Sequence, residues 1–192
     1  IETHAGGYVS SAQIAGLLDM DDTLVRKDLA AIGVRGRPRL GFSTQDLMGA
    51  IRETLGFNER YKSIIVGAGR LGGALASYGR FGKYGLHIVA LFDTDPLRVG
   101  EALGGAVVRP LDSLESVVRE HGVHLAVLTV PAETAQPLAD RLVDAGVRAI
   151  WNFAPTSLVL PKGIFVRHEH ISVGLAELAY YLKRTDLSAA AR

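Results

Sequence analysis

The chain has 192 residues, of which 48% are hydrophobic and 21% are charged, a composition typical of a globular protein with a sizeable core. The 21 Lys and Arg residues against 20 Asp and Glu residues give a net charge of +1, so a uniformly basic surface for nucleic acid is excluded and any basic site must be local. The absence of cysteine excludes disulfides, thiolate metal sites and reactive thiols. No apolar run approaches the roughly 20 residues that span a bilayer.

We therefore expect a cytoplasmic protein of two small domains, with no membrane partner. The chain opens at Ile1 without a methionine, and its first helical signal starts near Ser10. For this reason we also expect that some sequence is missing ahead of the first domain.

The first sixty residues predict two short helices joined by a tight turn. Ser10 or Ser11 is placed to cap a first helix that buries Ile14, Leu17 and Leu18. A second helix is expected to start at an Asp22 cap and to end at Gly33, with its inward face formed by Val25, Leu29 and Ile32.

A Gly-, Pro- and Arg-rich segment, residues 34–42, follows the second helix and favours the turn of a β-ribbon, which we interpret as a wing. Ser43 or Thr44 then caps a third helix with Leu47, Ile51 and Leu55 inward. Residues 1–60 are thus predicted to form a winged helix-turn-helix domain, and residues 57–62 lead out of it.

Basic side chains gather in the second helix and the wing. Between residues 26 and 39 five basic residues face the single acid Asp28, a local net charge of +4: Arg26, Lys27, Arg35, Arg37 and Arg39. A solvated basic loop would have the same composition. The order helix, turn, helix and wing instead favours DNA binding, with the second helix as the recognition helix.

After residue 60 apolar runs alternate with amphipathic stretches, which indicates βα repeats around a buried parallel sheet. The expected strands are residues 63–66, 87–92, 125–130, 149–153 and 163–168. We therefore expect a Rossmann-like domain over residues 61–168, and a last helix over residues 172–184 in the carboxyl-terminal segment 169–192.

Directly after the first of these strands the chain reads G-x-G-x-x-G, through Gly67, Ala68, Gly69, Arg70, Leu71 and Gly72. The first glycine of this pattern makes a tight turn, the second lets the backbone approach a pyrophosphate, and the third lets the helix pack on the strand. Asp93 ends the second strand 21 residues beyond Gly72, close to the spacing of an acid that binds the adenosine ribose. A carboxylate there also repels a 2′-phosphate, which favours NAD(H) over NADP(H).

Two further segments end the next core strands and should border the same crevice, because ligands of parallel α/β sheets lie at the carboxyl ends of strands. Thr129, Val130 and Pro131 form the first, and residues 152–155 (Asn152, Phe153, Ala154, Pro155) form the second. Their polar groups are candidates for contact with the nicotinamide half. The alternative is that the prolines only terminate the strands.

Other chemistries find little support. His168 and His170 flank Glu169 on one strand face, but no third metal ligand is evident, so no metal site is predicted. No G-x-S-x-G pattern is present to support hydrolysis.

Six stretches of this sequence, in order and spread over nearly the whole chain, resemble the Rex family of bacterial redox-sensing transcriptional repressors. They are Val25-Arg26-Lys27-Asp28-Leu29, the wing ending in Gly41-Phe42, residues 67–72, Phe92-Asp93-Thr94-Asp95-Pro96, Val130-Pro131-Ala132 and residues 152–155. The resemblance implies a homodimer that binds palindromic operator DNA and responds to the NADH/NAD+ ratio. It also implies that the last helix is exchanged between subunits, and it adds Asp95 and Tyr78 to the cofactor site.

Two positions depart from the family. The family has an aspartate and then a phenylalanine before the exchanged helix, where this chain has His170 and Ile171. An apolar Ile171 from the partner would suit the neutral ring of NADH better than the cationic ring of NAD+. The competing interpretations are an NAD-dependent oxidoreductase, for which no acid/base residue or substrate pocket is evident, and a CoA- or nucleotide-binding interaction module.

Overall fold

The computed structural model describes the backbone of residues 7–190 and the side chains of residues 7–170 and 172–184. The chain divides into two compact units. The first comprises Ile1–Arg60 and Lys83–Gly85, and the second comprises Tyr61–Gly82 and Leu86–Arg192. Within the first unit, the backbone carbonyl of Lys83 accepts a hydrogen bond from Arg52 Nη2 at 3.0 Å, which ties this short later segment to the earlier helices.

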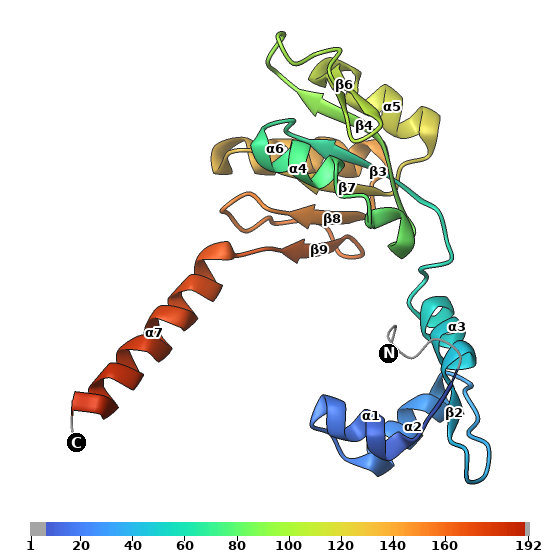
Figure 1. Ribbon diagram of the computed structural model, residues 1–192. Helices are drawn as coiled ribbons and strands as arrows, with labels where there is room; N and C mark the ends of the chain where they lie inside the picture. Colours follow the sequence, from blue (N-terminus) through green and yellow to red (C-terminus); the bar gives the residue numbers. More distant parts are fainter. Residues whose placement is uncertain (1–6, 191–192) are drawn as a thin grey trace. The chain divides into compact units, whose positions relative to one another are not determined.

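The first unit contains three helices and a small two-stranded sheet (Figure 1). Its elements are β1 (Tyr8–Val9), α1 (Ser11–Leu18), α2 (Asp22–Ala31), β2 (Phe42–Ser43) and α3 (Thr44–Thr54). Ser10 and Gln13 form a reciprocal capping box at the start of α1, and Ser43 caps α3. The unit has its own hydrophobic core: Ile14, Ala15, Val25, Leu29, Val34, Phe42 and Leu47.

Three local predictions for this unit are wrong. The cap of α2 is Asp21, whose carboxylate accepts hydrogen bonds from the backbone N–H groups of Thr23 and Leu24. The predicted burial of Leu17 and Leu18 fails, because α1 turns these side chains outward, with 76% and 59% of their surfaces exposed. The predicted inward position of Leu55 fails as well, because α3 ends at Thr54 and Leu55 already lies at its exposed cap.

The segment predicted as a wing turns back on itself at residues 37–41. Arg37 and Gly41 form an antiparallel bridge with backbone N···O distances of 2.7 and 3.0 Å. Beyond this bridge, β2 pairs with β1 rather than with the loop, in the register Tyr8 to Ser43 and Val9 to Phe42. The strand at Tyr8–Val9 carries no local sequence signal and depends on this long-range pairing.

The second unit is an α/β domain built on a seven-stranded sheet, which confirms the predicted Rossmann-like class. The strands follow the order β5-β6-β4-β3-β7-β8-β9, with only the β5–β6 pair antiparallel. They are β3 (Tyr61–Val66), β4 (Leu86–Asp93), β5 (Ala102–Leu103), β6 (Ala106–Pro110), β7 (Leu125–Leu128), β8 (Ala149–Asn152) and β9 (Phe165–His168). Because the chain reverses its direction of travel across the sheet between β3 and β7, a crevice opens at their carboxyl ends.

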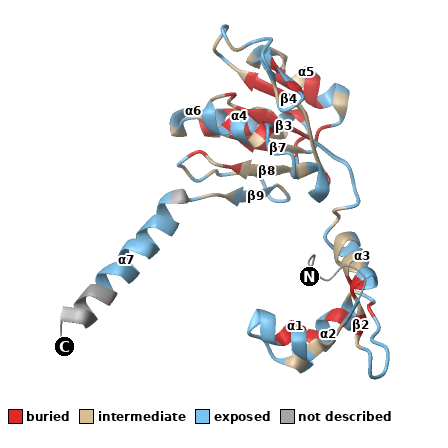
Figure 2. Ribbon diagram, in the orientation of Figure 1, coloured by how far each residue is buried: buried red, intermediate tan, exposed pale blue. Residues whose placement is uncertain are grey.

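Helices cover this sheet on both faces. They are α4 (Arg70–Ala76), α5 (Leu114–His121) and α6 (Ala132–Ala145), with short 3₁₀ turns η2 (Phe81–Tyr84) and η3 (Leu111–Ser113). Alternate strand residues divide between two cores. Ile64, Phe92 and Leu128 pack with α5 and α6, whereas Ile65 and Leu91 pack on the side of α4. The central strands are consequently buried on both faces (Figure 2).

The chain continues into a long helix, α7 (Ile171–Ala190). Residues 172–184 of this helix are all exposed (Figure 2), including the large apolar side chains of Val173, Leu175, Leu178, Tyr181 and Leu182. Within the described residues, no helix is long and apolar enough to cross a membrane.

Candidate functional site

The glycine loop between β3 and α4 is held by very close backbone packing. Gly67 has a φ of +101°, and a Cβ there would lie 2.6 Å from the carbonyl oxygen of Thr129. A Cβ on Gly72 would lie only 1.9 Å from the carbonyl oxygen of Gly67. The Thr129 hydroxyl donates a hydrogen bond to that same carbonyl at 2.7 Å. The two outer glycines are therefore required by the loop itself, with or without a ligand.

Gly69 differs from these two glycines, because a Cβ at this position would point into open space. Its backbone is extended, with φ −64° and ψ −166°, and a Cβ built there would meet no atom within 4 Å. Gly69 also lines a cavity of the second unit. The fold does not need a glycine at this position, whereas a ligand that approaches the backbone closely does.

Asp93 binds the glycine loop from the neighbouring strand. Its Oδ2 accepts a hydrogen bond from the Ala68 N–H at 2.8 Å, and its Oδ1 accepts one from the Asp95 N–H at 3.0 Å. A carboxylate offers about four acceptor positions, so both oxygens retain capacity for ligand hydroxyl groups. Asp95 itself accepts a hydrogen bond from the Leu97 N–H and shapes the turn that follows.

Arg98 was not predicted, yet it contacts the glycine loop directly. Its Nη1 donates a hydrogen bond to the Ala68 carbonyl at 2.6 Å, and its guanidinium lies 3.9 Å from Asp95 and 4.0 Å from Glu101. The peptide groups of Ala68 are thus fixed on one side by Asp93 and on the other by Arg98. No sequence pattern links Arg98 to Ala68, because the two residues meet only through the tertiary fold.

The cavity beside this loop has a volume of about 520 Å³. It brings together the predicted Gly67, Gly69, Asp93, Thr129, Val130 and Pro131. It also includes residues that sequence reasoning missed: Leu111, Glu133, Thr134, Pro137, Leu138 and Arg141. The last five recur at helical spacing on one face of α6, and this periodicity is the signal that would have identified them.

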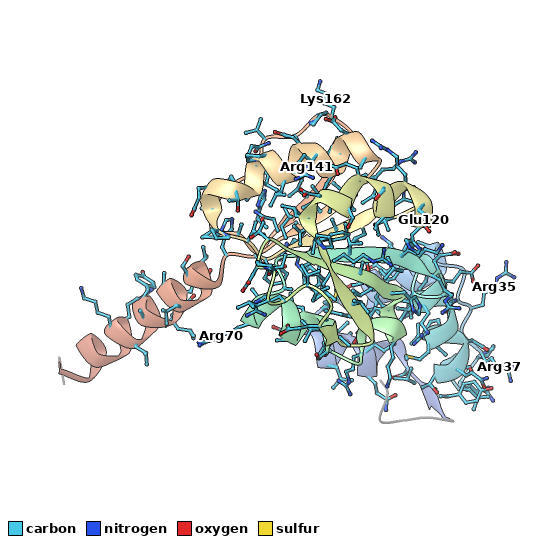
Figure 3. The ribbon with its side chains drawn as sticks, turned by 90° about the horizontal axis from the view of Figure 1, so that it is seen from above. Arg35, Arg37, Arg70, Glu120, Arg141 and Lys162 are labelled. Atoms are coloured by element: carbon cyan, nitrogen blue, oxygen red, sulfur yellow. The ribbon has the colours of Figure 1, made fainter. Side chains whose placement is uncertain are left out.

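An ion pair between α5 and α6 borders the cavity. Arg141 donates from Nε to Glu115 Oε1 at 2.6 Å and from Nη2 to Glu115 Oε2 at 3.1 Å. Nη2 also donates to the carbonyl of Leu111 at 3.2 Å. The hydrogen bonds between the two side chains hold the pKa of the Glu115 carboxyl below its ordinary value and raise the pKa of Arg141. Figure 3 shows Arg141 on α6, beside α5.

Within the described residues, the other predicted cofactor residues do not line this cavity. Ala68 is buried, whereas Arg70 and Leu71 are exposed at the start of α4, and Figure 3 shows the Arg70 side chain extending outward. Asn152 is fully buried. Its Oδ1 accepts a hydrogen bond from the Ala154 N–H, its Nδ2 donates to the Thr156 carbonyl, and Nδ2 also lies 3.0 Å from His168 Nδ1. This side chain shapes the turn over residues 152–156, which includes Pro155. The predicted roles of residues 152–155 at the nicotinamide remain predictions.

Tyr78 belongs to a series of aromatic rings that runs from the end of α4 to β8. Ring centroids are 4.9 Å apart for Tyr78 and Phe81, 5.9 Å for Phe81 and Trp151, and 4.9 Å for Trp151 and Phe153.

The side chain of Ile171 lies outside the described residues. Directly after β9, Glu169 accepts hydrogen bonds from Trp151 and Arg167. No metal-binding cluster is found within the described part of the chain.

The predicted DNA-binding residues are all exposed on the first unit: Arg26, Lys27, Arg35, Arg37 and Arg39. Arg26 forms an ion pair with Asp22 one turn earlier on α2, and the Arg37 guanidinium lies 5.5 Å from the ring centroid of Tyr8. Figure 3 shows Arg35 and Arg37 projecting outward. Arg39 has a φ of +61°, at the tip of the loop.

Comparison with known proteins agrees with this geometry. The CoA binding domain family model matches residues 58–156. The redox-sensing transcriptional repressor Rex of Carboxydothermus hydrogenoformans is 41% identical over 92% of this chain and 85% of its own length. The Rex of a Roseiflexus species is 37% identical over 95% of this chain and 82% of its own length.

Solved structures give the same result. One match is RSP, a Rex-family repressor. Its crystal structure in complex with beta-NAD+ and operator DNA has a TM-score of 0.89 and 30% identity, and the match covers 98% of this chain and 87% of RSP. Its complex with beta-NADH matches with a TM-score of 0.85 and 29% identity over all of this chain and 89% of its own. The chain therefore belongs to the Rex family of redox-sensing transcriptional repressors.

Proposed function

We propose that the chain is a cytoplasmic, redox-sensing transcriptional repressor. It acts as a homodimer that binds palindromic operator DNA through its first unit and releases the DNA when NADH occupies the cavity of its second unit. The observation that carries this proposal is Gly69, whose open side faces a cavity that Asp93 also lines. The named relatives are repressors, which favours a sensor over an oxidoreductase.

The cavity residues suit a dinucleotide. The backbone N–H groups at Gly69 bind the pyrophosphate, because no side chain keeps the ligand away from them. Asp93 accepts hydrogen bonds from the hydroxyl groups of the adenosine ribose, and its charge repels a 2′-phosphate. The site therefore selects NAD(H) over NADP(H).

Discrimination between the two redox states follows from the charge of the nicotinamide ring, which is positive in NAD+ and neutral in NADH. The residues proposed for this half of the site are Tyr78, residues 152–155 and Ile171 of the partner subunit, and none of them is acidic. Removing the cationic ring from water without a nearby carboxylate is unfavourable. NADH consequently binds more tightly, and this difference in affinity moves the protein between its two states.

The basic residues of the first unit suit DNA. The α2 helix presents Arg26 and Lys27, and the loop after it presents three further arginines, so contacts to phosphates and to a groove are available at one site. In a dimer, two such helices must sit about 34 Å apart to enter successive major grooves. We propose that NADH alters this separation.

The test is a titration of palindromic DNA with the full chain at fixed salt, alone and with NADH, NAD+, NADPH or CoA. We expect NADH alone to release the DNA strongly, and NAD+ to compete with it. DNA binding that ignores NADH, or that responds equally to CoA, contradicts the proposal.

Two variants separate the two halves of this function. Gly69→Val keeps the fold, because its backbone is extended and its Cβ meets no protein atom, but it blocks the pyrophosphate. It should bind DNA normally and ignore NADH. Arg26→Ala should show the reverse behaviour, with normal NADH affinity and weakened DNA binding. Loss of one phosphate contact also lowers the salt slope of DNA binding by about 0.9.

A further inference from the structure

The face of α6 that borders the cavity extends well beyond the glycine loop. It begins at Glu133 and Thr134, beside the loop-facing Pro131, and continues through Pro137 and Leu138 to Arg141. Arg141 lies eight positions after Glu133 in this helix, which corresponds to a rise of about 12 Å. Arg141 therefore lies at the end of the cavity that is remote from the proposed pyrophosphate position.

Arg141 is fixed in orientation at this end. Its Nε–H and both N–H groups of Nη2 are used by Glu115 and by the Leu111 carbonyl. The guanidinium plane is thereby locked, yet 37% of the side-chain surface remains exposed. Neither Glu115 nor the Leu111 carbonyl uses Nη1, and the side chain lines the cavity.

The surroundings of Arg141 suit a flat aromatic ring. Leu111 and Leu138 supply apolar surface to the cavity, and a locked guanidinium plane stacks favourably on an aromatic face. The base and the pyrophosphate leave the ribose at different carbons, so a ribose bound at Asp93 directs its base away from the glycine loop. A purine base fits these features better than a charged or flexible group does.

We propose that Arg141, held in place by Glu115, is the residue that binds the adenine ring of NADH. This inference rests on the proposed function, since it assigns the far end of the same cavity. It predicts that the Glu115–Arg141 pair contributes to affinity for the adenosine half of the dinucleotide and not for the nicotinamide half.

The experiment compares three ligands: NADH, ADP-ribose and reduced nicotinamide mononucleotide. The double variant Glu115→Gln with Arg141→Met removes the pair without leaving an unpaired charge at the cavity. It should bind NADH and ADP-ribose about tenfold more weakly and the mononucleotide as the wild type does. Arg141→Lys keeps the positive charge but loses the planar guanidinium. Its affinity for NADH and ADP-ribose should lie between those of the wild type and the double variant. Arg148→Met, an exposed arginine outside the cavity, is the matched control and should change nothing.

The outcomes are distinguishable. If the double variant binds ADP-ribose as tightly as a wild type that itself binds NADH, Arg141 only braces α5 against α6 and the inference is wrong. If the wild type binds neither NADH nor ADP-ribose, the proposed function fails together with the inference. If the double variant does not fold, a folded Arg141→Lys with unchanged ADP-ribose affinity overturns the inference.

Discussion

Arg39 occupies a backbone conformation that side chains disfavour. Its φ of +61° is in the left-handed region, which costs a non-glycine residue roughly 1–2 kcal/mol. Strain of this kind persists where function needs the side chain. Arg39→Gly should therefore raise the free energy of unfolding by up to about 1 kcal/mol, after the greater unfolded-state entropy of glycine is allowed for, and should weaken DNA binding.

Urea unfolding and DNA titration of the same variant measure the two effects. The diagnostic result is a gain in stability together with a loss of DNA affinity. If Arg39 were purely structural, the variant would be more stable and its DNA affinity would be unchanged. Arg35→Gly serves as a comparison, since it removes a neighbouring charge from a residue with no positive φ.

At this scale, the sequence predicted residues whose roles depend on near neighbours. Gly67, Gly69 and Asp93 stand at fixed spacings around one strand-loop-helix unit, and these three residues line the cavity. Arg98 and Arg141 escaped prediction because their partners, Ala68 and Glu115, lie 30 and 26 residues away in the chain. Such contacts depend on how whole elements pack.

The start of α2 shows how a single cap supports an element. Asp21 accepts hydrogen bonds from two backbone N–H groups, so Asp21→Ala should lower the stability of the first unit by about 1 kcal/mol. Asp22→Ala is the matched control, since it removes the neighbouring carboxylate, which pairs with Arg26 and does not cap the helix. Thermal unfolding of the two variants should differ, and equal losses would contradict the role of Asp21. The sequence placed this cap one residue late because two aspartates stand side by side.

The pair between α5 and α6 makes a pH-dependent contribution to stability. Arg141 lowers the pKa of Glu115 below its ordinary value of 4.5 in the folded state. The contribution is therefore complete above that value and is lost as the pH falls through the lowered pKa. Wild type and Glu115→Gln should differ in urea midpoint at neutral pH and converge in acid. A difference that grows with acid would contradict this assignment.

At the scale of the whole molecule, the order of elements was predictable because apolar period and glycine spacing are local properties. The pairing of β1 with β2 and the attachment of residues 83–85 to the first unit were not, because both join distant segments. The last helix was also predictable, and in the structure α7 carries large apolar side chains such as Leu175, Leu178 and Leu182. Their exposure in a single chain shows that this helix lacks a covering surface there, which supports the proposed exchange between subunits.

Coupling between the two units gives the last prediction. If NADH lowers the affinity for operator DNA by some factor, operator DNA must lower the affinity for NADH by the same factor, because both ligands shift one equilibrium. The coupling is typically 1–3 kcal/mol, or about 5- to 150-fold. NADH titrated into the full chain with saturating operator should therefore show a weaker Kd than without it, while Arg26→Ala, which binds DNA poorly, should show little change. Equal NADH affinity for the wild type with and without operator would mean that the cavity and the basic helix are not linked.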